Sequence, residues 1–265
     1  MNFFEKILKL LDSKMTTPTP YSWFHILFLF LTIIGCIFIV KKGKKLGEKQ
    51  NRKLLFIFGL IMIIFEIYKQ LNYSYNPSND TWDYQWYAFP FQFCSTPMYI
   101  IFISSFFAPS KFRDKLYAFL SSYSILAGAI VMLMPSTVFT STIGINIQTM
   151  LHHGGMVVIG VYLAATNRTN LHKKSILDAL PTFLILVSIA FILNISIYQS
   201  GILNGETFNM FYISPYFDTS LFIFDKIQPY IPYPIFLIIY IFAFTLGAYL
   251  ILTLETYIQN KRIPQ

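Results

Sequence analysis

Long apolar runs, separated by short polar or charged segments, dominate the chain. Each run is about 20 residues long, which at about 1.5 Å per residue of helix crosses a hydrocarbon core of about 30 Å. Backbone groups cannot stay unpaired in lipid, and runs this continuous do not fit the alternating strands of an outer-membrane barrel. The pattern therefore predicts an all-α polytopic membrane protein, a bundle of seven transmembrane helices. The expected spans are 23–40, 54–71, 87–107, 116–134, 147–164, 176–198 and 234–254.

The segments outside these spans suggest a simple domain organisation. Apolar residues in 3–11 recur at helical spacing and alternate with charged ones, which is typical of a short amphipathic helix lying on the membrane surface. We therefore divide the chain into an interfacial N-terminal segment, 1–20, and one transmembrane domain, 21–265. Within this domain, the outer loop 199–233 is the one segment long enough to form a lid.

Lysine and arginine gather in alternating loops. The loop 41–53 holds seven of them, 111–115 and 167–174 hold three each, and 260–262 holds two, which leaves only five of the 20 elsewhere. Because cytoplasmic loops are enriched in these residues, we expect the N-terminus outside the cell and the C-terminus in the cytoplasm, with the protein in the plasma membrane. The net charge of +8 then reflects topology and attraction to anionic lipid, and it indicates no nucleic-acid partner. The sequence identifies no protein partner.

Several polar residues interrupt the apolar spans at one depth. Glu66, Cys94, Asn194 and the pair His152 and His153 fall near the outer ends of four expected helices, roughly 6 to 11 Å below the membrane boundary. Polar groups in a bilayer are costly, so each is expected to face the bundle interior and to have a partner. The shared depth predicts a single buried polar site that opens toward the outer leaflet.

Prolines and glycines flank the cysteine and the histidines. Pro90 and Pro97 stand at i−4 and i+3 from Cys94, on its own face of the expected helix, and each leaves a backbone carbonyl without its usual donor. Gly154 and Gly155 follow the histidines and allow a neighbouring helix or a lipid chain to approach the backbone closely. These features favour a pocket.

Each polar residue also has a purely structural explanation. A cysteine in a membrane helix is often an inert small apolar group, and Glu66 is spaced to pair with Lys69 one turn further along. Asn194 and one of the histidines would then serve as hydrogen-bonding groups between helices. Cys36 is expected near the cytoplasmic end of the first span, too far from Cys94 for a disulfide.

A cysteine and a histidine in one layer are sufficient for nucleophilic acyl transfer. An apolar medium disfavours the thiolate, so the cysteine needs a base or a stabilising cation, and a Cys–His pair can form a thioester acyl-enzyme. Zinc binding by His152, His153, Cys94 and Glu66 is the rival use. Adjacent helical residues point about 100° apart and rarely ligate one ion together, so we expect no metal, and no cofactor is implied.

Three stretches carry a resemblance to a known family: FPFQFCSTPMYIIFI, INIQTMLHHGGMVVIGVYL and FNMFYISPYFDTSLFIFDKIQPYIPYPIFLIIY. They resemble YwaF-type bacterial integral membrane proteins and, more remotely, the animal transmembrane-protein-164 acyltransferases. The resemblance extends from the second expected helix to the seventh. The matching features are Cys94, His153 with Tyr162, Asn209 with Met210, and the Pro-aromatic-Pro sequence of 232–234.

The resemblance implies a reaction and residue roles. In the animal relatives a fatty acyl chain moves between phospholipids through an acyl-cysteine, assisted by a histidine. Carried over, Cys94 would be the nucleophile and His153 the general base, with His152 as the alternative partner. Asn209 would be an orienting or oxyanion-binding group. The bacterial members often have a histidine two residues before the cysteine, where this chain has Gln92, a departure that bears on activity.

The sequence thus predicts a membrane-embedded lipid acyltransferase or transacylase that acts on a phospholipid or lysolipid near the outer leaflet. Glu66, Gln92 and Asn194 are supporting candidates, and a hydrolase would differ only in using water as acceptor. The alternative from another class is a non-catalytic lipid- or solute-binding membrane protein or a transporter. The inner halves of the spans are almost purely apolar apart from serines in 121–124, which disfavours a water-filled route. A scaffold whose polar layer only fixes helix packing is the third possibility.

Overall fold

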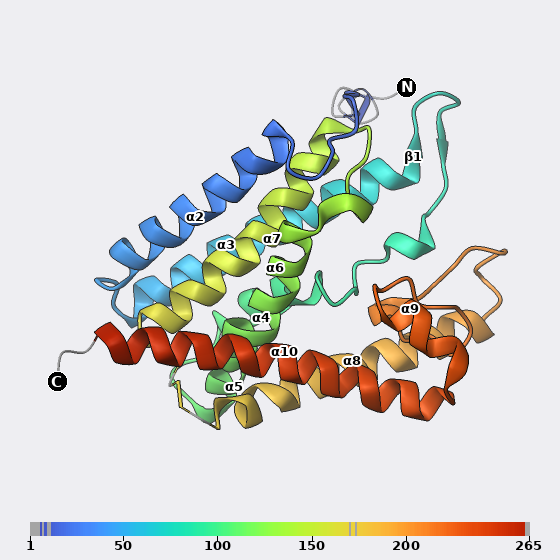
Figure 1. Cartoon of the computed structure of the whole chain (residues 1–265). Helices are drawn as coiled ribbons and strands as arrows, with labels where there is room; N and C mark the ends of the chain where they lie inside the picture. Colours follow the sequence, from blue (N-terminus) through green and yellow to red (C-terminus); the bar gives the residue numbers. More distant parts are fainter. Residues whose placement is uncertain (1–5, 7, 10–11, 170, 173, 263–265) are drawn as a thin grey trace.

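The chain folds into a helical bundle that is long enough to cross a membrane (Figure 1). The computed structural model describes residues 6, 8–9, 12–169, 171–172 and 174–262. Among these residues six helices are long and apolar enough to span, which indicates an integral membrane protein. They are α2 (Trp23–Gly43), α3 (Glu48–Ser74), a continuous helix over Lys111–Leu133, α7 (Ile143–Ala165), α8 (Ser175–Gln199) and α10 (Tyr233–Arg262). The predicted amphipathic helix at 3–11 lies for the most part outside the described residues.

The expected span 87–107 is the one that differs from the sequence prediction. Its α-helix, α4 (Thr96–Ser104), has nine residues, too few to cross a membrane alone. Residues 83–95 are irregular apart from the 3-10 turn η1 (Trp86–Ala88). Pro90 explains the break, because it lacks a backbone N–H and disfavours the helical conformation of Phe89, whose ψ is 135°. The seventh complete transmembrane helix is therefore not confirmed.

The segment 83–107 nevertheless runs from one end of the bundle to the other. It begins after a two-stranded hairpin, β1 (Tyr75–Asn76) and β2 (Thr81–Trp82), that follows the end of α3. It ends where the carbonyl oxygens of Ser105 and Phe106 accept hydrogen bonds from Arg52 in the second turn of α3, at 2.8 and 3.0 Å. The chain thus passes along the whole length of α3 in a path that is only partly helical (Figure 1).

Two helices form the centre of the bundle. In the apolar windows of Lys111–Leu133 and α7, 72% and 67% of the residues are buried, against 17 to 33% in the other four helices. The Lys111–Leu133 helix consists of α5 (Lys111–Phe119), a π-helical turn η2 (Leu120–Ser124) and α6 (Ile125–Leu133). Because α7 packs against α2, α3, α6 and η2, its polar side chains are surrounded by protein rather than lipid.

The basic loops meet at one end of the bundle, which we call the basic end. Arg113 forms an ion pair with Glu48, and Arg168 donates a hydrogen bond to the Leu46 carbonyl oxygen at 2.6 Å. These contacts join the loops 41–53, 111–115 and 167–174. The opposite end carries the hairpin and the loop 199–233 (Figure 1). It also contains η3 (Pro135–Thr137), η4 (Met210–Tyr212), α9 (Phe224–Ile227) and η5 (Gln228–Tyr230).

A glycine fixes the close approach of α3 and α4. A Cβ atom on Gly59 would lie 2.8 Å from the backbone of Phe102, closer than such atoms approach in real structures. We expect Gly59→Ala to lower the thermal midpoint of the detergent-solubilised protein by several degrees, because overpacking costs about 1–3 kcal/mol. Gly47→Ala is the matched control, because its Cβ would meet only the end of Gln50 at 3.8 Å. Equal midpoints for the two variants would contradict the α3–α4 packing.

Candidate functional site

The irregular segment 83–95 is held by side chains that hydrogen-bond to its backbone. Non-helical backbone at membrane depth is tolerated only where protein groups or water replace the missing helical bonds. Three side chains from α3, α4 and α7 do so here, and the last of them fixes the position of Cys94. The acceptors are the carbonyl oxygens of Ala88, Pro90 and Cys94, and the donors are Gln70 (2.6 Å), Tyr99 (3.0 Å) and His152 (3.0 Å), respectively.

Both histidines of α7 are oriented by a carbonyl oxygen. His152 Nε2 lies 3.0 Å from the Cys94 oxygen, and His153 Nδ1 lies 2.7 Å from the Thr149 oxygen. A carbonyl oxygen only accepts, so these ring nitrogens carry the proton. The other nitrogens, His152 Nδ1 and His153 Nε2, are buried and have no hydrogen-bond partner among the described residues. In a neutral imidazole each of them is the basic lone pair, available to take a proton.

Glu66 forms an ion pair with Lys69, as its purely structural explanation predicts. Its Oε1 lies 2.8 Å from Lys69 Nζ and also accepts a hydrogen bond of 2.8 Å from Gln70. The Cys94 thiol is within electrostatic range of both Lys69 and Glu66. The pair is therefore satisfied by itself, and both of its charges act on the Cys94 thiol through space. Lys69 was considered in the sequence only as the partner of Glu66.

Two amide side chains clamp a turn of the loop 199–233 onto this segment. Asn194 Oδ1 accepts from the Met210 backbone N–H at 2.7 Å, and its Nδ2 donates to the Met210 carbonyl at 3.0 Å. Gln92 accepts from the Phe211 N–H at 3.0 Å and donates to the Asn209 carbonyl at 3.1 Å. Asn194 thus binds loop backbone rather than a neighbouring helix. Gln92 joins the segment that carries Cys94 to the same turn.

Asn209 is engaged within its own loop. Its Oδ1 accepts from the Ser214 N–H at 2.8 Å, and its Nδ2 donates to the carbonyl oxygens of Asp218 at 3.1 Å and Phe217 at 3.4 Å. Both ends of the carboxamide are used, so its role in this structure is to shape the turn.

The clamped turn contains strained backbone and carries Tyr212, a residue that no sequence feature selects for the site. Phe211 and Tyr212 have positive φ values of 58° and 57°, which non-glycine residues rarely adopt. Burial raises the pKa of the Tyr212 phenol, a Cys94 thiolate would raise it further, and a hydrogen bond with Ser220 lowers it. Tyr240, on α10, is fully buried, has no hydrogen-bond partner for its hydroxyl among the described residues, and is in electrostatic range of Cys94 and Tyr212.

The glycines after the histidines serve helix packing. A Cβ atom on Gly154 would lie 2.4 Å from Thr32 Oγ1 of α2, and one on Gly155 would lie 3.0 Å from the Phe58 ring of α3. The sequence leaves open whether these glycines admit a neighbouring helix or a lipid chain. In the structure, both glycines contact neighbouring helices. Cys36 and Cys94 are both free thiols and both partly buried. In the described part of the chain, no group of three or more His, Cys, Asp or Glu side chains is placed to hold a metal ion.

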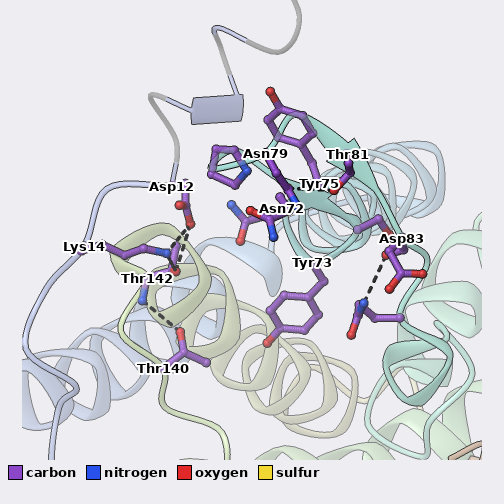
Figure 2. Close-up of a pocket in the computed structure, with 14 residues that line it drawn as sticks. Asp12, Lys14, Asn72, Tyr73, Tyr75, Asn79, Thr81, Asp83, Thr140 and Thr142 are labelled. Atoms are coloured by element: carbon purple, nitrogen blue, oxygen red, sulfur yellow. Dashed lines mark hydrogen bonds and ion pairs between the residues drawn. The ribbon is translucent and has the colours of Figure 1, made fainter. Parts of the chain in front are cut away.

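A separate polar cavity lies at the end opposite the basic end. It has a volume of about 490 Å³ and is bounded by the N-terminal segment, the end of α3, the hairpin and the loop before α7. Figure 2 shows Lys14 between Asp12 and Thr142, with an ion pair of 2.7 Å to Asp12 and a hydrogen bond of 3.2 Å to Thr142. Its lining includes none of the site residues predicted from the sequence. Tyr73, which lines this cavity, contacts Tyr87 of the irregular segment, with ring centroids 6.1 Å apart.

Comparison with known proteins gives a family assignment. No curated protein and no solved structure gives a significant match to the chain. A model of the TMEM164 family matches residues 20–252, from just before α2 to near the end of α10. The matched region contains Cys94, both α7 histidines and the clamped turn. It supports the resemblance to the transmembrane-protein-164 proteins and does not confirm the YwaF-type bacterial assignment. Because the match covers far more than half of its residues, the chain belongs to the TMEM164 family.

Proposed function

We propose that the protein is a lipid acyltransferase or transacylase that carries the acyl chain on Cys94. The observation that carries this proposal is a pair of buried ring nitrogens, His152 Nδ1 and His153 Nε2, that have no partner among the described residues. Both belong to the helix that hydrogen-bonds the Cys94 backbone. Nucleophilic acyl transfer by a cysteine requires a base for the thiol proton, and an oriented neutral imidazole can serve as that base. The resemblance to the animal transmembrane-protein-164 acyltransferases implies the same reaction class, and the chain belongs to the TMEM164 family.

The proposed membrane topology follows from the distribution of lysine and arginine. The basic end faces the cytoplasm, and the chain crosses the plasma membrane seven times if the partly helical segment 83–107 counts as one crossing. Cys94 then lies on the outer side of the membrane centre, with the polar cavity of Figure 2 at the outer surface. The substrates are phospholipids or lysolipids of the outer leaflet.

In the first half-reaction, the basic histidine nitrogen takes the proton of the Cys94 thiol, and Sγ attacks the carbonyl carbon of a lipid ester. The tetrahedral intermediate collapses by breaking the ester C–O bond. The protonated histidine gives its proton to the departing oxygen, so a lysolipid leaves and the acyl group remains as a thioester on Cys94. The histidine is neutral again at the end of this step.

In the second half-reaction, the acceptor hydroxyl gives its proton to the same histidine, and its oxygen attacks the thioester carbonyl. The C–S bond breaks, and the histidine returns the proton to the Cys94 sulfur. With a lysolipid as acceptor the outcome is transacylation, and with water it is hydrolysis. The choice depends on whether water reaches the thioester.

The two histidines take different roles in the proposal. His152 uses Nε2 to hold the Cys94 carbonyl, so we assign it to positioning the irregular segment. The Nδ1 of His153 is held by the Thr149 carbonyl, and its Nε2 has no partner in the described part of the chain, so we assign His153 as the general base. The phenol of Tyr240 is the proposed donor to the oxyanion, because its hydroxyl is buried, unpartnered among the described residues and in electrostatic range of Cys94.

We predict a thioester adduct that depends on Cys94. Intact mass spectrometry of the detergent-purified protein, incubated with mixed phospholipids, should reveal an added acyl mass that hydroxylamine removes. Cys94→Ala should lack the adduct, and Cys36→Ala, the matched control at the other free and partly buried thiol, should keep it. An adduct that survives in Cys94→Ala would refute the assignment. No adduct in any form, even with acceptors withheld, would favour a non-catalytic lipid-binding protein or transporter.

The histidine roles predict unequal effects on the rate of adduct formation. His153→Ala should slow acylation by about 10² to 10⁴, the range of a lost general base. His152→Gln retains an N–H donor for the Cys94 carbonyl and should stay within about tenfold of wild type. Single-turnover acylation kinetics check both values, with the thermal midpoint as the measure of folding. The reverse order would make His152 the base.

The proposed role of Tyr240 predicts that removing its hydroxyl lowers activity without lowering stability. Tyr240→Phe should slow acylation roughly 100-fold, because an oxyanion donor is lost. Removing a buried hydroxyl that no described residue hydrogen-bonds should leave the thermal midpoint unchanged or raise it. Tyr249→Phe on the same helix, where the side chain is 42% exposed, is the control and should change neither quantity. A normal rate in Tyr240→Phe would remove it from the mechanism.

A further inference from the structure

A cleft at the basic end combines positive charge with exposed aromatic rings. It has a volume of about 700 Å³ and lies between the first turns of α3 and the C-terminal end of α4. Its lining includes Lys49, Arg52 and Lys53 on the polar side and Phe56 and Phe106 on the apolar side. We call it the basic cleft. It is at the opposite end of α3 from the Glu66–Lys69 pair, so it is distinct from the Cys94 site.

The positive charge of the basic cleft is not neutralised by protein. Glu48, the acidic residue of the lining, is paired with Arg113. Arg52 is held by hydrogen bonds to two carbonyl oxygens, which leave its charge uncompensated. Lys49 and Lys53 are exposed, and in the described part of the chain neither forms an ion pair. Lysines four residues apart on a helix repel each other, so an anion bound between them would stabilise this arrangement.

The floor of the basic cleft is suited to a hydrocarbon chain. The Phe56 and Phe106 side chains are 37% and 54% exposed, and their rings contact each other with centroids 5.8 Å apart. Leu60, one turn further along α3 toward the centre of the bundle, is 38% exposed. Cations therefore lie at the end of the helix, and an apolar surface continues from them in the direction of the membrane core. A soluble anion would use only the charged half of this surface.

We propose that the basic cleft binds one anionic phospholipid from the leaflet at the basic end. The phosphate lies between Lys49 and Lys53, with the fixed Arg52 guanidinium behind it, and an acyl chain lies along Phe56 and Phe106. Basic pockets between transmembrane helices recognise anionic headgroups in this way. The proposal rests on charge complementarity and on the continuity of the cationic and apolar surfaces. It is independent of the reaction at Cys94.

The test measures lipid binding to the full-length protein in detergent micelles by native mass spectrometry. The lipids are phosphatidylglycerol and phosphatidylcholine, and glycerol 3-phosphate is the soluble competitor. Lys49→Gln/Lys53→Gln should weaken phosphatidylglycerol binding about tenfold or more and leave phosphatidylcholine binding unchanged. Lys41→Gln/Lys42→Gln, the matched control, removes the same charge from exposed side chains at the end of α2 and should change the affinity less than about twofold.

Three results would overturn the proposal. Equal losses in the two double variants would mean that the general surface potential attracts the lipid. Unchanged affinity in Lys49→Gln/Lys53→Gln would mean that no site exists in the cleft. Competition by glycerol 3-phosphate at the same concentration as the lipid would identify a soluble phosphate as the ligand.

Phe106→Ala should weaken phosphatidylglycerol binding several-fold, and an unchanged value would remove the acyl-chain contact. Thermal midpoints in phosphatidylcholine show that each variant is folded.

Discussion

The need to satisfy every backbone polar group inside a membrane governs the structure around Cys94. A regular helix meets that need internally, but Pro90 interrupts the helix and leaves the preceding segment without its ladder of hydrogen bonds. Side chains of Gln70, Tyr99 and His152 replace those bonds from three different helices. These hydrogen bonds to the backbone are a structural reason for the three polar side chains in apolar spans, independent of any reaction.

The same constraint creates the conditions for chemistry. Once Nε2 of His152 is committed to a carbonyl, its tautomer is fixed and the other ring nitrogen has a free lone pair. His153 reaches the equivalent state by donating to the Thr149 carbonyl of its own helix. Cys94 lies at the end of the irregular segment, two residues before α4 begins. Structural and catalytic explanations of the polar layer are therefore compatible rather than alternatives.

The sequence was sufficient for the parts of this structure that follow from periodicity. Six apolar runs are helices near their predicted bounds, and the pairing of Glu66 with Lys69 follows from a spacing of three residues. The break in the third span was visible as Pro90, but a proline kinks many helices without unwinding them. Which occurs depends on whether distant side chains can replace the lost bonds. Those partners, Gln70 and His152, are far away in the sequence.

The clamped turn is a second feature that could not be predicted from the sequence. The stretch around Tyr212 contains no glycine, so nothing in it signalled two successive residues with positive φ. That conformation is imposed by Gln92 and Asn194, which hold the backbone of the turn from two other elements. Asn209 was selected by resemblance, and its carboxamide is used within the loop. Tyr240 is one aromatic among many in an apolar span, and only the fold brings it into electrostatic range of Cys94.

Helix α3 positions the interrupted span along its whole length. Near one end Gln70 holds the Ala88 carbonyl, and near the other Arg52 holds the last carbonyls of the span. Between them, Gly59 lets the α4 backbone approach so closely that a single Cβ would force the helices apart. A short helix with an irregular lead-in cannot set its own depth in a membrane, because too few of its residues form a continuous apolar surface. Three contacts to one long, well-defined helix set that depth instead. The position of Cys94 relative to the α7 histidines is therefore determined by the packing of α3 against both neighbours.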